Sequence, residues 1–262
     1  MSPGPTSFCV DSRMARETDD AAAGKLSPPP WGFWATAGFG LVILGTFYVT
    51  QSLAFGIVYS LSPPATDVPL QSYTSDGDVL SLLTLVSGTA SLLLIAVLAF
   101  IRSRHPTAYV GFATRPEPSA VLTWVAVAFG LGTVHTFLAP AAGVASPPDF
   151  LVKVWASTDC VAWLVLGVAV MAPLFEETFF RGFLYRGWGE SLGVVWTATL
   201  TTLLWTAVHV QYGWYERIYI GTMGLLLTAA RFQTNSLWTP LCMHAVNNGL
   251  ALACMALENT TP

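Results

Sequence analysis

Residues 31–66 contain no Asp, Glu, Lys or Arg, and this charge-free run constrains the fold more than any other feature of the sequence. At about 1.5 Å per residue, a helix of this length exceeds the roughly 30 Å hydrocarbon core of a bilayer. Charged residues make up only 10% of the chain, whereas soluble globular domains have about 25%. We therefore expect most of the protein surface to face lipid.

Six more apolar runs follow the first one. They lie at residues 79–101, 120–138, 160–175, 192–210, 215–230 and 239–257. In lipid the backbone must satisfy its own hydrogen bonds, which leaves α-helices or a closed β-barrel. Because the runs are continuous rather than alternating, the sequence predicts an all-α, polytopic integral membrane helical bundle. This bundle is expected to have about seven transmembrane helices, or eight if one run is broken in two.

The basic residues are divided unequally between the two sides that seven alternating spans define. With a cytoplasmic N-terminus, nine of them fall inside and only Lys153 and Arg217 fall outside. This bias follows the positive-inside rule, so a cytoplasmic N-terminus is predicted. The nine inside residues are Arg13, Arg16, Lys25, Arg102, Arg104, Arg115, Arg181, Arg186 and Arg231.

Several strongly polar residues lie in or beside the apolar runs, namely Glu176, Glu177, His209, His244, Asn247 and Asn248. An ionised side chain in the bilayer costs about 2.5–3.5 kcal/mol on insertion scales, so such residues usually have a function. Glu177 and Arg181 are four residues apart and can pair on one helix face, which a structural role would also explain. For His105 and His135 we expect structural roles only.

The other polar residues each have a structural explanation beside a functional one. Glu176 has no basic residue three or four positions away, although water at a helix end would also solvate it. His209 ends the run LLWTAVHV and would suit a membrane interface. His244 and Asn248 lie one turn apart in an apolar helix, and an interhelical hydrogen bond would explain them too.

Taken together, these residues place a carboxylate on one helix, an imidazole on the next, and an imidazole with an amide on a later one. A hydrolase needs a general base for water and hydrogen-bond donors for an oxyanion. Glu or His can accept the proton, whereas His and Asn can donate hydrogen bonds. The set therefore indicates hydrolysis within the membrane.

Three short motifs carry a family resemblance. EETFFR at 176–181 resembles the EExxxR motif of the CAAX-protease and bacteriocin-processing family of intramembrane endopeptidases. WTAVH at 205–209 is similar to its aromatic-xxx-His motif, and HAVNN at 244–248 to its His-xxx-Asn motif. Order and spacing agree over residues 160–257. Trp205 is a departure, since phenylalanine is commoner there.

The resemblance implies a role for each matched residue. Glu176 and His209 would activate the attacking water, and His244 and Asn248 would form the oxyanion hole. The substrate would be a membrane-associated protein or peptide, prenylated and CaaX-like for some members and of another kind for many prokaryotic relatives. Two further residues would complete and hold the first motif, Glu177 and Arg181.

A zinc-dependent version of the same protease is the mechanistic alternative. Glu176, His209 and His244 would then be the ligands of an open three-ligand zinc site. The sequence has no HExxH, and Asn248 is a poor zinc ligand but a good oxyanion donor. We therefore expect glutamate-type catalysis without a cofactor, and Zn²⁺ is the cofactor of the alternative.

Two non-proteolytic classes compete with the protease. A membrane immunity or scaffold protein that keeps the fold would tolerate the loss of Glu176, His209 or His244. A transporter would show Gly/Pro-interrupted repeats in two halves, and the halves of this sequence do not look related. The expected partners are membrane lipids and a membrane-anchored substrate; the small net charge of −4 gives no sign of nucleic acid binding.

The chain divides into four predicted parts. Residues 1–30 mix Pro, Ser, Ala and Asp and predict a disordered cytoplasmic tail. Residues 31–158 are expected to form the N-terminal transmembrane helices with their loops, and residues 159–257 a CAAX-protease-like catalytic core. Residues 258–262 form a short tail. We expect a multi-pass membrane protein whose active site faces the cytoplasm.

Overall fold

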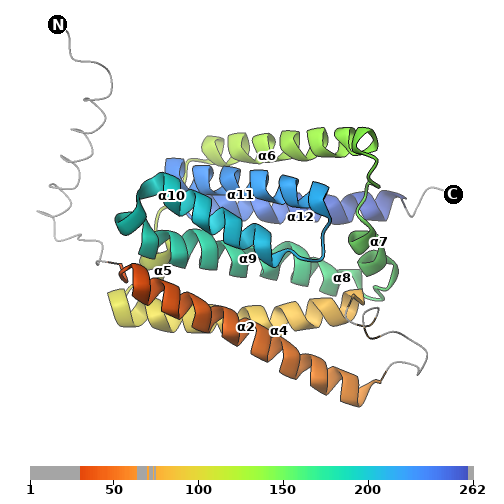
Figure 1. The fold of residues 1–262 in the computed structure, drawn as a ribbon, viewed down its shortest axis with the longest axis horizontal. Helices are drawn as coiled ribbons and strands as arrows, with labels where there is room; N and C mark the ends of the chain where they lie inside the picture. Colours follow the sequence, from red (N-terminus) through yellow and green to blue (C-terminus); the bar gives the residue numbers. More distant parts are fainter. Residues whose placement is uncertain (1–29, 64–69, 71–72, 74, 259–262) are drawn as a thin grey trace, which may run out of the picture.

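The chain folds into one bundle of helices. The computed structural model describes residues 30–63, 70, 73 and 75–258, so most of both predicted tails lies outside the described residues. Within the described part every regular element is a helix, and the helices pack side by side (Figure 1). This confirms the predicted all-α, polytopic membrane bundle.

The helices fall into three groups along the chain. The first group is α2 (Phe33–Leu61), α4 (Gly77–Ser103), α5 (Pro106–Val110), α6 (Pro118–Leu138), η1 (Pro140–Ala142) and α7 (Asp149–Ala156). One long helical stretch follows, made of α8 (Val161–Leu164), η2 (Val165–Met171), α9 (Ala172–Glu176), η3 (Glu177–Leu184) and α10 (Tyr185–Val208). The last group is α11 (Trp214–Thr234) and α12 (Trp238–Glu258).

Five helical stretches among the described residues are long and apolar enough to cross a membrane. They are Phe33–Leu61, Gly77–Ser103, Pro118–Leu138, Val161–Val208 and Trp238–Glu258. The stretch Val161–Val208 has 48 residues and contains both the fourth and the fifth predicted span. Helix α11 covers the predicted sixth span but is not one of the five, so its crossing of the membrane stays a prediction.

Gly193 divides the long stretch into two arms. Its φ of 71° and ψ of 172° are not helical, and glycine adopts a positive φ at little cost. Figure 1 shows the chain turning back there, so that α10 lies beside η3. The first arm thus continues past residue 175, where the apolar run ends, and the helix contains the predicted pair of Glu177 and Arg181.

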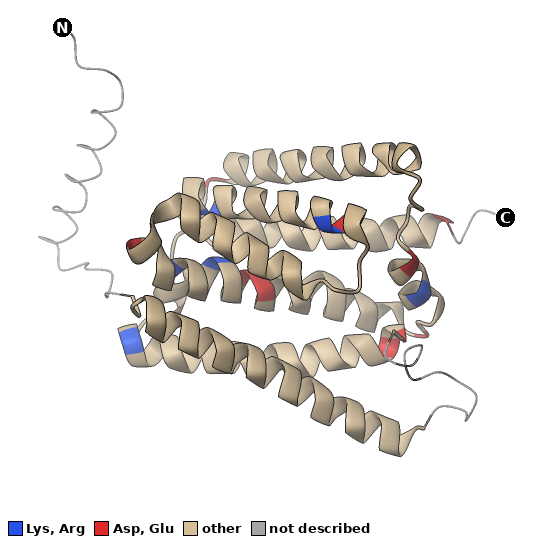
Figure 2. Ribbon diagram, in the orientation of Figure 1, with Lys and Arg blue, Asp and Glu red and all other residues tan. Residues whose placement is uncertain are grey.

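The bundle has a basic end and an acidic end (Figure 2). At the basic end, where α2 begins, Trp188 donates to the carbonyl oxygen of Phe33. At the acidic end, where α4 and α8 begin, the Asp159 amide donates to Asp78. Among the described residues, the basic end has five arginines and two glutamates: Arg102, Arg104, Arg115, Arg186, Arg231, Glu117 and Glu190. The described part of the acidic end has six carboxylates and two basic residues: Asp76, Asp78, Asp149, Asp159, Glu216, Glu258, Lys153 and Arg217.

Candidate active site

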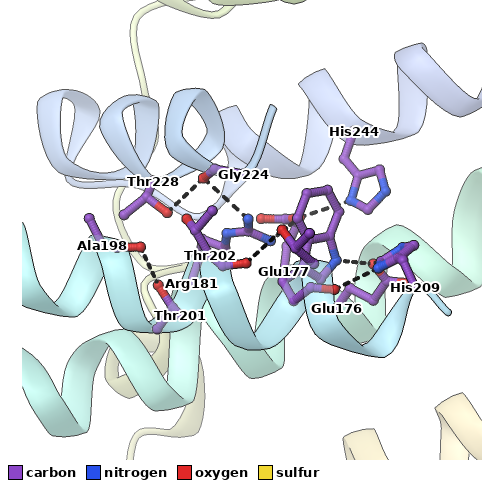
Figure 3. A network of polar contacts seen from close by, with 12 residues as sticks. Glu176, Glu177, Arg181, Ala198, Thr201, Thr202, His209, Gly224, Thr228 and His244 are labelled. Carbon is purple, nitrogen blue, oxygen red and sulfur yellow. Dashed lines mark hydrogen bonds and ion pairs between the residues drawn. The ribbon is translucent and has the colours of Figure 1, made fainter. Parts of the chain in front are cut away.

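Glu177, Arg181 and His244 form an enclosed cluster in the bundle. The Glu177 and Arg181 side chains are 0% exposed, and Arg181 Nη1 donates to Glu177 Oε1 at 3.1 Å. His244 Nδ1 lies 2.8 Å from the same oxygen, with Arg181 on the opposite side of the carboxylate (Figure 3). The predicted pair of Glu177 and Arg181 therefore has a second role, because the Glu177 carboxylate also orients the His244 imidazole of α12.

Helix α11 passes so close to this cluster that it needs a glycine there. A Cβ on Gly224 would lie 2.9 Å from Thr202 Cγ2 and 3.0 Å from Trp205 Cε3, which is closer than packed atoms normally come. Without that side chain, the carbonyl oxygen of Gly224 accepts a hydrogen bond of 3.2 Å from Arg181 Nη2. Arg181 of η3 thus forms hydrogen bonds both within η3 and to α11.

Glu176 and His209 form a second, more open pair. Trp205 Nε1 donates to Glu176 Oε2 at 2.5 Å, and His209 Nε2 lies 4.0 Å from that oxygen. The side chains of His209 and Glu176 are 15% and 20% exposed. The carboxylate and the imidazole are too far apart for a direct hydrogen bond, but a water molecule can bridge them.

The hydrogen bonds of both imidazoles leave Nε2 free. His209 Nδ1 lies 2.6 Å from the carbonyl oxygen of Trp205, which can only accept. Nδ1 therefore carries the hydrogen, and Nε2 of the neutral ring has a free lone pair. The same holds for His244, because its Nδ1 contacts the carboxylate that Arg181 neutralises. Each ring thus presents Nε2 as its reactive atom.

Trp205 joins the enclosed cluster and the open pair, and it is not one of the site residues predicted from the sequence. Its ring lies 4.5 Å from the Arg181 guanidinium carbon and makes edge contacts with both imidazoles, at 5.0 Å to His209 and 5.4 Å to His244. Its indole N–H is the donor to Glu176. The signal was present in the sequence, since a phenylalanine at this position would lack that donor.

Asn248, a predicted site residue, donates its hydrogen bond to a backbone group outside the two clusters. Its Nδ2 donates to the carbonyl oxygen of Val168 at 2.9 Å. In the π-helical segment η2 that carbonyl would pair with the amide of Pro173, five residues on, but proline has no N–H. Asn248 therefore satisfies a backbone group that proline leaves unpaired. Asn247 also has its own partner, because its Oδ1 accepts from Tyr219 at 2.5 Å.

The two histidines expected to be structural lie outside this site. His135 stacks on the rings of Tyr215 and Tyr219, with centroids 4.4 Å and 4.5 Å away. His105 precedes α5 at the basic end and makes no side-chain cap there. Neither is in contact with the carboxylates of the site among the interactions of the described residues.

The surroundings of the site are closed toward the basic end. All eight residues of η3 are buried, from Glu177 to Leu184. On the other side, His209 is followed by Val210, which is 71% exposed, and by the exposed residue Gln211. The more exposed side of the site therefore faces the acidic end.

Tyr212 lies in the turn on this open side. Its ring stacks on His209 with a centroid distance of 6.2 Å. Burial, followed by the negative charges of Glu176 and Glu216, raises the pKa of Tyr212 to about 12. The phenol therefore keeps its proton at neutral pH and remains a hydrogen-bond donor beside the site.

The predicted zinc ligands belong to two separate hydrogen-bonded groups. Among the described residues no three His, Cys, Asp or Glu side chains are grouped to hold a metal ion. Glu176 Oε2 accepts from Trp205, and His244 Nδ1 contacts Glu177, whereas Nε2 of His209 and of His244 remains free. Both the metal-free and the zinc-dependent mechanism therefore stay predictions.

Comparison with known proteins agrees with the three motifs. Residues 158–250 match the family model described as type II CAAX prenyl endopeptidase Rce1-like. An Escherichia coli protein described as an uncharacterized 24.3 kDa protein is 30% identical over 138 residues, which are 49% of this chain and 62% of that relative. The chain thus spans less than two thirds of the curated relative it matches. No solved structure matches the chain. Over residues 158–250 the chain is similar to the Rce1-like type II CAAX prenyl endopeptidases, and the predicted family resemblance is confirmed.

Proposed function

We propose that this protein is a membrane endopeptidase that cleaves a membrane-associated protein or peptide with a glutamate-activated water. The observation that carries the proposal is the pair of Glu176 Oε2 and His209 Nε2, which face each other at 4.0 Å and are both partly exposed. Similarity to a family of membrane proteases supports the same reaction class. The conclusion rests on the site, because a fold alone does not determine a reaction.

In the proposed reaction a water molecule between Glu176 and His209 attacks the carbonyl carbon of the peptide. One water proton passes to Glu176 or to Nε2 of His209, and the oxygen forms the new C–O bond. The C–N bond then breaks, and the departing amine takes up the proton. Trp205 holds the carboxylate oxygen and, through its carbonyl, the His209 ring.

The tetrahedral oxyanion needs hydrogen-bond donors. We assign this task to His244 and Asn248, as the resemblance implies. His244 Nε2 can donate only when the ring is protonated, because its Nδ1 hydrogen already points to Glu177. Asn248 has one amide hydrogen left beside its bond to Val168. Tyr212, protonated next to His209, is an additional donor.

Catalysis without a metal is part of the proposal. The carboxylate and the imidazoles are each oriented by protein hydrogen bonds rather than toward a common centre. A prenylated CaaX-like protein is one candidate substrate, and the family name supports it. Peptides without a prenyl group form the other candidate class.

We propose a revised orientation for the site. Both the N-terminus and the active site are predicted from the sequence to lie on the cytoplasmic side. The site is closed toward the basic end, where α2 begins, and open toward the acidic end. If the basic end faces the cytoplasm, as the positive-inside rule favours, substrates enter from the other side of the membrane.

Cysteine labelling tests this orientation. In a chain without its native cysteines, Gln211→Cys marks the open side and Ala113→Cys the basic end, and both positions are exposed. A membrane-impermeant maleimide should label Gln211→Cys in intact spheroplasts and Ala113→Cys only after permeabilisation. The reverse pattern would return the active site to the cytoplasm.

Proteolysis itself is tested with the protein reconstituted in nanodiscs. Prenylated and unprenylated peptides are incubated with wild type and with Glu176→Gln, and the products are identified by mass spectrometry. We expect cleavage by wild type and a loss of about 10²–10⁴-fold in Glu176→Gln, as for removal of a general base. Glu117→Gln, an exposed carboxylate at the basic end, is the matched control. Undiminished cleavage by Glu176→Gln would refute the proposed role.

A further inference from the structure

A cavity of about 290 Å³ lies at the acidic end, between α7 and the turn that follows α10. Its wall includes the carboxylates of Asp149 and Glu216 and the rings of Phe150 and Tyr212. The two rings contact each other with centroids 5.4 Å apart. The cavity therefore combines negative charge with an aromatic surface.

Glu216 is the most informative residue of this wall. It is only 7% exposed, yet its carboxylate makes no hydrogen bond or ion pair with any described residue. Its position in the first turn of α11 is favourable for a negative charge, which is the plain structural explanation. The Glu216 oxygens are not among the sealed polar atoms without a partner in the described residues, so they remain accessible from the cavity.

The basic residues at the acidic end, Arg217 and Lys153, form no ion pair with this carboxylate among the described residues. Arg217 Nε donates to the carbonyl oxygen of Tyr212 and its Nη2 to that of Val210, both at 2.9 Å. Lys153 is exposed and forms no ion pair among the described residues. Two negative charges of the cavity thus remain open to a cationic ligand.

The cavity adjoins the candidate active site through one residue. Tyr212 belongs to the cavity wall, and its ring also stacks on His209 at a centroid distance of 6.2 Å. An extended peptide advances about 3.3 Å per residue. A substrate bound at Glu176 and His209 therefore reaches the cavity with a side chain only a few residues from the cleaved bond.

We propose that this cavity is a subsite for a basic side chain, arginine or lysine, of the peptide substrate. The inference rests on the proposed function and narrows its substrate class to peptides with a cation near the cleaved bond. A guanidinium can pair with Glu216 and Asp149 and lie on the aromatic rings of Phe150 and Tyr212. A calcium ion fits less well, since it takes six to eight oxygen ligands and no three potential ligands gather in the described residues.

The test measures binding of fluorescent octapeptides to Glu176→Gln protein in nanodiscs, so that cleavage is not needed. A single arginine is moved along the peptide, and each peptide has a twin with the neutral isostere citrulline. At one or two positions we expect arginine to bind about tenfold or more tightly than citrulline, the scale of a hydrogen bond to a charged group. Equal affinity of the twins at every position, or no binding of any peptide, would overturn the proposal.

Substitutions in the cavity wall test which residues cause the preference for arginine over citrulline. Adding Glu216→Gln should abolish the preference for arginine, and Asp149→Asn, an exposed position, should reduce it about two- to threefold. Glu117→Gln, at the basic end, should leave it unchanged. A preference that survives Glu216→Gln, or that is lost in Glu117→Gln, would contradict the assignment. Thermal melts identify a variant that fails to fold, and Asp149→Asn then decides alone.

The outcomes separate the subsite from the proposed function. If the arginine preference is found but wild type cleaves none of the bound peptides, the cavity binds cations and the protease proposal fails. If wild type cleaves arginine and citrulline peptides equally well and binds them equally, the protease stands and the subsite fails.

Discussion

Two adjacent glutamates, Glu176 at the end of α9 and Glu177 at the start of η3, have opposite surroundings. Glu177 is fully enclosed and bound by both Arg181 and His244. Glu176 is 20% exposed and has the indole of Trp205 as its hydrogen-bond partner. The 100° turn between consecutive helical residues separates them. One carboxylate therefore holds the architecture, and its neighbour remains available to a water molecule.

The two glutamates should also differ in their contribution to the stability of the fold. A buried ion pair contributes little net stability, because desolvation offsets the attraction, but removing one partner leaves a buried charge uncompensated. The enclosed cluster should therefore be sensitive in stability and the open pair in activity. The following predictions test that separation.

The largest expected effect is on stability. Glu177→Ala leaves Arg181 charged and enclosed, and we expect the free energy of unfolding to fall by about 3–5 kcal/mol. Glu176→Gln should change it by about 1 kcal/mol or less, since a partly exposed amide still accepts from Trp205. Equilibrium unfolding in mixed micelles measures both. Equal destabilisation by the two variants would contradict the separation.

Trp205→Phe should have the next largest effect. The variant keeps an aromatic ring beside Arg181 but loses the hydrogen bond to Glu176, so kcat should fall about tenfold or more with little change in KM. Trp196→Phe, a lipid-exposed tryptophan of the same helix, is the control. Full activity of Trp205→Phe would show that the indole N–H does not position the carboxylate.

A smaller effect is expected from Tyr212 at high pH. Its pKa is about 12 in the folded protein against an ordinary value of 10, so the folded state favours the protonated form. This stabilisation is complete below pH 10 and is lost as the pH rises toward 12. Thermal melts should therefore fall less steeply between pH 10 and 12 for Tyr212→Phe than for wild type. Parallel curves would contradict the pKa shift.

The smallest expected effect is that of a chelator. Since the proposed mechanism uses no metal, we expect cleavage to continue unchanged after dialysis against EDTA or phenanthroline. The zinc content of the active protein is measured in parallel by elemental analysis. Stoichiometric zinc together with chelator-sensitive turnover would replace the metal-free mechanism and keep the protease.

Much of this fold could be predicted because lipid imposes simple rules on a sequence. Charge-free runs of sufficient length allow only helices, and each predicted run coincides with a helical segment. The turn within the long stretch Val161–Val208 could not be predicted from the apolar runs, because it depends on the positive φ of Gly193.

The site was predictable residue by residue but not contact by contact. Glu176 and His209 lie 4.0 Å apart, and their catalytic roles stay a prediction. Spacing did not reveal that His244 turns to Glu177, because that contact joins helices 67 residues apart in the chain. Nor could spacing foresee Asn248 bonding to Val168, which depends on where Pro173 interrupts a π-helical segment.

A double-mutant cycle on Glu176 and His209 tests the central claim most directly. The kcat/KM of wild type, Glu176→Gln, His209→Gln and the double variant is measured on one cleaved peptide. Residues that activate one water act as a unit, so the double variant should be about as slow as either single variant. Losses that multiply, or a single variant with wild-type activity, would contradict the account.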